Sequence, residues 1–308
     1  MTDRIAVTGA NGFVGRHLTT LAAAQRWEVA GVVRSEKAEA AVRDAGGRPY
    51  RVDTYDAASL RPAFEGARAV VHLAGISAER GGATYAAVNV EGARQVAKAA
   101  RDAGVPRVVF FSGLGVARYG QHPRCTNRYF LAKLESEIEL YRSGLEVVCC
   151  RPSYIIGPGS ELVPQLLQEF QAGEVERLGD GSYRLQPVAV KDVAEMVFAS
   201  ARRELTRHLV IDTVGPEPLT YAAFIDRVAA AARRMGLPAD HRIREVPIED
   251  ADRQAAAGGY RGLRPDELDV LLCDEVASPQ GIEAALGRFL TPLDEAIEAA
   301  IRGSRARR

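Results

Sequence analysis

A short apolar segment followed by three evenly spaced glycines constrains the fold of this chain more than any other feature. Residues 5–7 (Ile-Ala-Val) predict a strand, and Gly9, Gly12 and Gly15 follow in a G-x-x-G-x-x-G pattern. From Gly12 to Arg26 the periodicity is helical. A glycine turn between a strand and a helix suits a pyrophosphate, because the backbone can approach it closely and the helix N-terminus offers free N–H groups. The turn therefore predicts dinucleotide binding at the start of a βαβ series.

The first half of the chain alternates short apolar runs with amphipathic stretches. Strands are expected at residues 5–7, 28–33, 51–52, 69–73, 108–111 and 146–150, and helices at 12–26, 36–45, 85–103 and 128–143. Apolar strands that alternate with helices indicate a parallel sheet covered on both faces. The expected fold class is α/β, a Rossmann-type doubly wound parallel sheet with a smaller C-terminal substrate lobe.

After Pro152 this alternation becomes less regular. Helices are expected at residues 162–171, 221–235 and 279–301, strands at 188–190 and 208–211, an extended segment at 242–246, a turn at 179–181 and a loop at 255–259. Residues 1–160 are expected to form the dinucleotide-binding domain. Strands near 186–212 rejoin its sheet, and most of 161–308 forms the substrate lobe.

Charge and hydropathy exclude several classes of partner. Lys and Arg together number 40, as do Asp and Glu, so no global field favours nucleic acid. No segment approaches the ~20 apolar residues that span a bilayer, so no membrane insertion is expected. The first strand begins near Arg4, which leaves no room for a signal peptide, and a cytoplasmic location is expected.

The cysteines predict neither a disulfide nor a metal site. They lie at 125, 149, 150 and 273, with no CxxC pair and no histidine at ligand spacing. Cys149 and Cys150 adjoin on a predicted buried strand, where neighbouring side chains point to opposite faces. We expect them to be small apolar fillers of a protein in a reducing compartment.

Five motifs in the first half of the chain resemble the short-chain dehydrogenase/reductase superfamily, in its extended or atypical branches. They are Thr8–Gly15, His72-Leu73-Ala74-Gly75, Asn89, the pair Tyr129 and Lys133, and Arg151–Gly159. The resemblance implies an NAD(P)(H) coenzyme, a small-molecule substrate and a homodimer through the fourth and fifth helices. The coenzyme contacts that it implies are Gly9, Asn11, Gly12, Phe13, Val14, Gly15, Leu73, Ala74, Gly75, Asn89, Tyr129, Lys133, Pro152, Tyr154 and Ile155.

A narrower resemblance lies further along the chain. Residues 179–193, 271–278 and 290–295 are similar to the branch that contains the nucleotide-binding accessory subunit of respiratory complex I. Members of that branch bind NADP(H) and often have no assigned reaction. This resemblance therefore implies coenzyme binding without implying catalysis.

The end of the second strand favours NADP(H) over NAD(H). NAD-selective members place an acidic residue there, whereas this chain has Arg34 followed by Ser35. A guanidinium can pair with a 2′-phosphate and stack on adenine. Two alternatives stay open: Glu36 could reach the ribose, and Arg34 could be an exposed charge at a helix entry. Asp53, after the third strand, fits the family's adenine-contacting acid and is equally a common turn residue.

Tyr129 and Lys133 are the expected acid/base pair. Four residues apart on a helix they share a face, and a lysine ammonium near a phenol should lower the pKa of the phenol. The family's catalytic Ser or Thr should lie two residues beyond Ser112, where this chain has Leu114. Ser112 itself, or Thr126, could replace it. Leu114 puts ordinary carbonyl reduction in doubt.

Three functions are compatible with these motifs. The first is an NADP(H)-dependent oxidoreductase acting on a small carbonyl or alcohol that the sequence does not identify. The second is a sugar-nucleotide epimerase or dehydratase, in which Arg184 could meet a substrate diphosphate. The third is a non-catalytic NADPH-binding redox sensor or assembly factor. Tyr129 and Lys133 favour an enzyme, and Leu114 favours the third function.

Overall fold

The computed structural model describes residues 3–202 and 209–305. Its main feature is a seven-stranded sheet in which every neighbouring pair of strands is parallel. From edge to edge its strands are β11 (Leu209–Thr213), β6 (Glu146–Pro152), β5 (Arg107–Phe111), β4 (Ala69–His72), β1 (Arg4–Thr8), β2 (Glu28–Val33) and β3 (Arg48–Arg51). The chain builds outward from β1 in both directions, which confirms the expected Rossmann-type doubly wound sheet.

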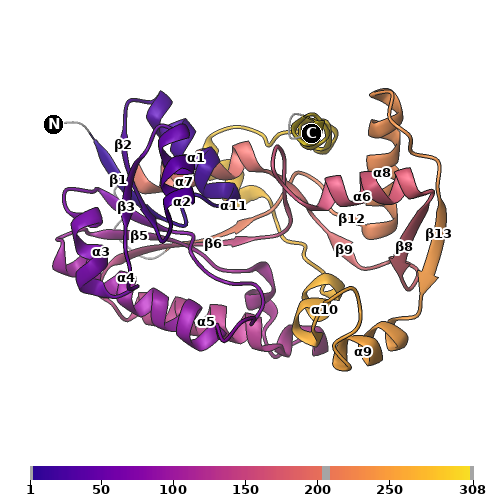
Figure 1. Ribbon diagram of the computed structural model, residues 1–308, viewed down its shortest axis with the longest axis horizontal. Coiled ribbons are helices and arrows are strands. Elements are labelled where there is room, and N and C mark those ends of the chain that lie inside the picture. Colours follow the sequence, from indigo (N-terminus) through magenta and orange to yellow (C-terminus); the bar gives the residue numbers. More distant parts are fainter. Residues whose placement is uncertain (1–2, 203–208, 306–308) are drawn as a thin grey trace.

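Helices cover both faces of the sheet because successive strand side chains point to opposite sides. In β1, Ile5 and Val7 belong to one apolar core and Ala6 to the other. The first core is covered by α1 (Phe13–Ala24), α2 (Glu36–Asp44), α7 (Val190–Arg202) and α11 (Gln280–Leu286), and the second by α3 (Ala57–Phe64), α4 (Glu91–Asp102) and α5 (Arg128–Tyr141) (Figure 1). Cys149 and Cys150 are fully buried in opposite cores, as the alternation predicts.

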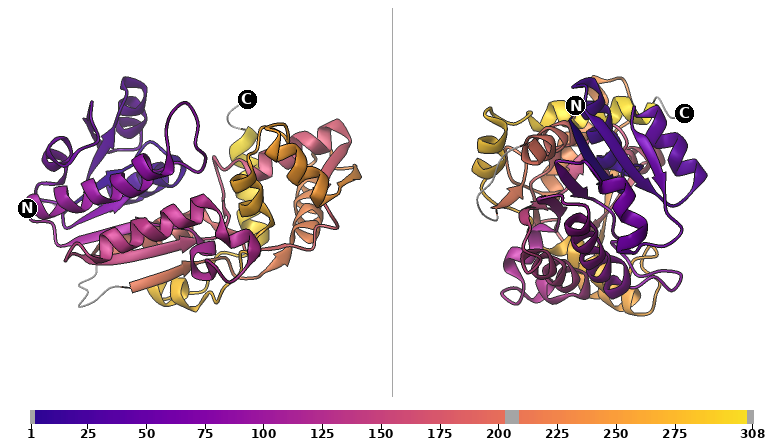
Figure 2. Two further views of the ribbon diagram at one scale, coloured as in Figure 1. Left: turned by 90° about the horizontal axis from the view of Figure 1, so that it is seen from below. Right: turned by 90° about the vertical axis from the view of Figure 1, so that its left-hand side faces the viewer.

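A lobe built mostly from the C-terminal half lies at one end of this layered sheet (Figure 2). One of its cores lies among α6 (Leu162–Ala172), α8 (Tyr221–Arg234) and α12 (Leu293–Arg305). A second, smaller core lies among β8 (Glu174–Leu178), β13 (Arg242–Val246), α9 (Ile248–Ala256) and α10 (Pro265–Leu272). Two short pairs complete it: β7 (Ile155–Ile156) with β10 (Val188–Ala189), and β9 (Arg184–Leu185) with β12 (Leu219–Thr220).

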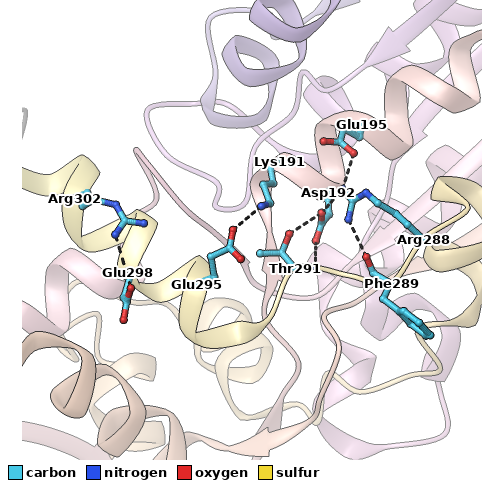
Figure 3. Close-up of polar contacts among 9 residues, drawn as sticks. All are labelled: Lys191, Asp192, Glu195, Arg288, Phe289, Thr291, Glu295, Glu298 and Arg302. Atoms are coloured by element: carbon cyan, nitrogen blue, oxygen red, sulfur yellow. Dashed lines mark hydrogen bonds and ion pairs between the residues drawn. The ribbon is translucent and has the colours of Figure 1, made fainter. Parts of the chain in front are cut away.

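The single helix expected at residues 279–301 is wrong, because α11 and α12 are separate helices. Gly287 ends α11 with a left-handed φ of +70°. Beyond it, the buried carboxylate of Asp192 accepts hydrogen bonds from the backbone nitrogen of Thr291 at 2.8 Å and from its hydroxyl at 2.9 Å, and it pairs with Arg288 at 2.7 Å (Figure 3). A buried carboxylate needs such partners. They hold the connection between α11 and α12 against the start of α7.

Other differences from the sequence expectations are local. The third strand ends at Arg51 instead of beginning there, and Val190 begins α7 instead of ending a strand. The strand expected at 208–211 is β11, although His208 lies outside the described residues. Helix α9 extends into the loop expected at 255–259, and α3, α7, α9 and α10 were not predicted. In the described ranges, no helix combines the length and hydropathy that crossing a bilayer requires.

Candidate active site

The glycine turn between β1 and α1 has no room for a side chain at two of its three glycines. Gly9 has a φ of +72°, and a Cβ there would lie 2.9 Å from the backbone nitrogen of Ala74. A Cβ at Gly15 would collide with the carbonyl oxygen of Gly9. At Gly12, which is exposed, a Cβ would meet only the oxygen of Gly9, at 3.1 Å. The N–H of Gly12 itself donates a 2.9 Å hydrogen bond to the oxygen of Gly9, but within the described chain no side chain caps the first turn of α1, so the N–H groups of that turn are available to an anion.

The end of β2 carries a free cation. Arg34 is exposed and forms no hydrogen bond or ion pair with any other residue that the structure describes. Ser35 caps α2 by accepting a 3.3 Å hydrogen bond from Ala38, and its hydroxyl proton stays available. Asp53 is exposed after β3. Tyr55, which the sequence did not single out, lies near Arg34, and burial raises the pKa of its phenol to about 12.

The loop after β4 is held open beside Lys133. Asn89 accepts a 2.9 Å hydrogen bond from the backbone nitrogen of Ile76 and donates one of 3.0 Å to its oxygen. A Cβ at Gly75 would lie 3.0 Å from Oδ1 of Asn89 and 3.7 Å from Nζ of Lys133. Asn89 therefore positions the loop, and the missing side chain of Gly75 leaves space next to the lysine.

His72 ties this loop to the glycine turn. Its Nδ1 lies 2.7 Å from the hydroxyl oxygen of Thr8, which also accepts a 3.3 Å hydrogen bond from the backbone of Ala74. Burial lowers the pKa of His72 to about 3, so the imidazole is neutral at physiological pH. We infer a positioning role for His72 and no proton transfer.

Tyr129 and Lys133 lie in the first two turns of α5, which begins where Asn127 accepts a 2.9 Å hydrogen bond from Phe130. Nζ of Lys133 lies 5.8 Å from the centroid of the Tyr129 ring. Burial lowers the pKa of Lys133 to about 8. Burial also raises the pKa of Tyr129 above its usual value, so the expectation that the lysine lowers it is wrong for the protein alone. Desolvation of the phenolate is the largest cause, and the charge of Glu275 adds to it.

Ser112 is the hydroxyl best placed beside this pair. Its Oγ is buried and has no hydrogen-bond partner within the described chain. A Cβ at Gly113 would lie 3.8 Å from Cε1 of Tyr129, so the tyrosine ring packs against the residue that follows Ser112. Leu114 is buried, and the exposed Thr126 donates to the oxygen of Pro123 at 2.8 Å. Of the two substitutes considered for Leu114, only Ser112 has a hydroxyl free for a ligand.

A buried carboxyl that the sequence did not predict lies near the pair. Glu275 follows α10 and is 6% exposed, and burial raises its pKa to about 8. Its charge acts to raise the pKa of both Tyr129 and Tyr154. Ser153 donates a 3.1 Å hydrogen bond to the backbone oxygen of Glu275 and thereby fixes this segment against the end of β6. Nothing local in the sequence marks Glu275, because its environment comes from distant segments.

Two of the cysteines meet beside Tyr129. Sγ of Cys125 and Sγ of Cys273 lie 2.6 Å apart, both residues are buried, and both thiols are free. His122 joins them, so that one potential ligand atom from each of the three residues lies within 4.8 Å of the others. The two sulfur atoms are therefore closer together than two thiolates bound to one tetrahedral Zn²⁺, which lie roughly 3.8 Å apart. The separation of 148 residues hid this contact from spacing arguments.

The predicted site residues gather at the carboxyl ends of strands that are neighbours in the sheet. Asn11, Phe13 and Val14 follow β1, Leu73, Ala74 and Gly75 follow β4, Ser112 follows β5, and Pro152, Tyr154 and Ile155 lie at the end of β6 and in β7. This is the edge at which ligands bind in open parallel sheets. Arg34, Ser35 and Asp53 lie farther along it, after β2 and β3.

Comparison with known proteins shows that the part of the chain containing this site matches a protein family. The profile described as "NAD dependent epimerase/dehydratase family" matches residues 5–211. Cinnamoyl-CoA reductase 1 of Oryza sativa subsp. japonica is 32% identical over 247 residues, which are 68% of this chain and 71% of that protein. Ceramide reductase of Caulobacter vibrioides is 29% identical over 198 residues, which cover 64% of this chain and 61% of that protein.

Solved structures share the fold over nearly the whole chain. MoeE5, determined in complex with UDP-glucuronic acid and NAD, superposes with a TM-score of 0.74 at 23% identity and covers 99% of this chain and 100% of that one. UDP-glucuronic acid 4-epimerase from Bacillus cereus, in complex with UDP-glucuronic acid and NAD, also gives a TM-score of 0.74, at 16% identity and with the same coverage. At these identities the likeness concerns the fold alone.

Proposed function

The chain belongs to the NAD dependent epimerase/dehydratase family, and on that premise we propose that it is an NADP(H)-preferring oxidoreductase acting on the carbonyl or alcohol of a small molecule. Its relatives include reductases and dehydrogenases, which confirms the expected enzyme class. The observation that carries the proposed reaction is the grouping of a partnerless serine hydroxyl, a protonated phenol and a lysine around residues 111–113. Carbonyl reduction needs such a proton donor, hydrogen-bond donor and cation.

The residues present fit a dinucleotide. The exposed Gly12, which carries no side chain, and the uncapped first turn of α1 would receive the pyrophosphate, and Lys133, beside the space at Gly75, would bind the nicotinamide ribose. The coenzyme, when bound, supplies the hydride for the carbonyl carbon. Arg34 and Ser35 would hold a 2′-phosphate, since one offers an unpaired guanidinium and the other a free hydroxyl proton.

Three side chains would donate the proton to the substrate oxygen and stabilise the charge that develops there. Tyr129, whose raised pKa keeps the phenol protonated at neutral pH, donates its proton to that oxygen. Lys133 stabilises the phenolate that this leaves behind. Ser112 donates a hydrogen bond to the same oxygen and thereby replaces the family's Ser or Thr, whose position Leu114 occupies in this chain. In the reverse direction Tyr129 would accept the proton of an alcohol.

A non-catalytic NADPH-binding protein is the second candidate. The buried Leu114 and the raised pKa of Tyr129 favour it, because both slow carbonyl chemistry. It also agrees with the similarity of residues 179–193 to the complex I accessory-subunit branch. A homodimer through α4 and α5 and a cytoplasmic location stay predictions under either function.

A screen of NADPH oxidation tests the proposal. Wild type and Tyr129→Phe are assayed together against aldehydes, ketones and quinones. The phenylalanine keeps the ring packing and removes the transferable proton, so turnover should fall ~10²–10⁴-fold while NADPH affinity barely changes. Tight NADPH binding without oxidation by any substrate would favour the second candidate. Equal turnover of the two proteins would remove Tyr129 from catalysis.

A further inference from the structure

A cavity of about 260 Å³ in the lobe has an aromatic wall. Tyr154, Tyr183, Tyr221 and Tyr260 line it, together with five leucines. The rings of Tyr183 and Tyr221 are stacked, with centroids 5.2 Å apart and planes inclined by 16°. Aromatic faces and leucine side chains recognise apolar, ring-shaped groups. The volume lies near the lower end for small-molecule sites and suits a compact ring system.

The charged groups in this wall already have protein partners. Arg261 forms an ion pair with Glu169. Glu176 accepts hydrogen bonds from Arg244 and from the phenol of Tyr260. These are the charged members of the lining, so the cavity presents no unpaired cation to a ligand.

The arginines just outside the wall are also paired. Arg184, which the sequence suggested for a substrate diphosphate, makes two hydrogen bonds to Asp274, of 2.8 and 3.0 Å. Arg177 pairs with Glu245 at 3.1 Å. A diphosphate placed here would meet cations that already have carboxylate partners, and it would lie beside Asp274 and Glu245, whose charges repel it. The surroundings therefore reject the diphosphate of a sugar nucleotide.

We propose that the substrate is an uncharged ketone or aldehyde on a compact aromatic or alicyclic ring, whose ring body lies in this cavity, and that it is not a nucleoside diphosphate sugar. The inference rests on the proposed function and specifies its substrate class. The segment at Cys273–Glu275 connects cavity and reaction site: Leu185, which lines the cavity, forms a β-bridge with Glu275. Cys273, two residues earlier, packs in the same apolar cluster as Tyr129.

Calorimetric titration of the NADP⁺-saturated protein tests the inference without turnover. The probes are 2-tetralone, an uncharged ring ketone, and UDP-glucose. We expect 2-tetralone to bind at least tenfold more tightly. Leu263→Lys, which places a cation in the lining, should weaken 2-tetralone binding at least tenfold, and Leu263→Ala should weaken it less. Ile243→Lys is the matched control, because Ile243 is 40% exposed on β13 and outside the lining, and it should change the affinity less than twofold.

Each outcome separates the inference from the function on which it rests. Tighter binding of UDP-glucose than of 2-tetralone overturns the inference, and so does a Leu263→Lys protein that keeps its fold and binds 2-tetralone like wild type. Reduction of open-chain aldehydes but of no ring ketone would overturn the inference and leave the reductase intact. Binding of 2-tetralone as expected, without reduction of any ring or open-chain carbonyl by NADPH, supports the cavity assignment and refutes the reductase.

Discussion

Nζ of Lys133 donates a 2.9 Å hydrogen bond to the backbone oxygen of Phe111, the residue before Ser112. This bond holds the lysine of the Tyr-x-x-x-Lys pair at the carboxyl end of β5, 5.8 Å from the ring centroid of Tyr129. Burial lowers the pKa of Lys133 from 10.5 to about 8. The fold therefore loses stability by keeping a cation where the proposed reaction needs one.

Lys133→Met should remove the stability penalty of the buried ammonium and, at the same time, lower activity. The wild-type penalty for a buried ammonium is fully present below the folded pKa of about 8 and disappears as the pH rises toward the unfolded value of 10.5. Between pH 7 and pH 10 the free energy of unfolding of wild type should therefore rise by about 2 kcal/mol relative to that of the variant, as measured by urea unfolding. Turnover and coenzyme affinity should both fall. Lys98→Met, at an exposed lysine on α4, is the control and should keep the turnover and coenzyme affinity of wild type.

Arg34→Asp should remove the preference for NADPH. In wild type the unpaired guanidinium should favour NADPH over NADH at least tenfold, about 1.4 kcal/mol, in calorimetric titration. The aspartate repels the 2′-phosphate and can accept from both ribose hydroxyls. Arg302→Asp, on α12, should leave both affinities unchanged. Equal affinity of the wild type for the two coenzymes would contradict the assignment of Arg34.

Gly12→Val and Gly15→Ala should fail in different ways. The added Cβ at Gly12 meets only the oxygen of Gly9, so Gly12→Val should fold and lose coenzyme binding, because the valine fills the space needed by the pyrophosphate. At Gly15 a Cβ collides with the backbone of Gly9 and Ala10, so Gly15→Ala should lose ~1–3 kcal/mol of stability. Thermal melting and NADPH titration measure the two effects. Normal NADPH binding by Gly12→Val would place the pyrophosphate elsewhere.

The fold class could be predicted because its signals are local. Apolar strands such as residues 5–7 alternate with helices, and the glycine turn marks the first crossover. The errors arose where neighbouring segments have similar local patterns. Val188–Ala189 is a strand and the equally apolar Val190 begins a helix, while Pro62 lies inside α3, where proline is rare.

The candidate site was only partly predictable from the sequence. Ser112 lies at the edge where the parallel strands end, as the topology rule anticipates, and Lys133 of α5 reaches that edge through its hydrogen bond to Phe111. The environment of Glu275, and the contact of Cys125 with Cys273, depend on how the lobe packs against α5 and β6. The direction of the pKa shift of Tyr129 depends on its burial, which spacing does not report.

Ser112→Ala should make the protein more stable and less active. The hydroxyl of Ser112 is buried without a hydrogen-bond partner in the described chain, so its removal relieves a desolvation penalty of ~1–3 kcal/mol and should raise the melting temperature. Without this donor to the substrate oxygen, kcat should fall ~10²-fold or more, while KM changes little. The control is Ser136→Ala, because the fully buried Ser136 donates a 2.7 Å hydrogen bond to Ala132. The free energy of unfolding of that variant should fall by about 1 kcal/mol, and its turnover should stay unchanged. If Ser112→Ala turned over as wild type, another group would have to stabilise the oxygen. If it were also less stable, the hydroxyl would have a structural partner.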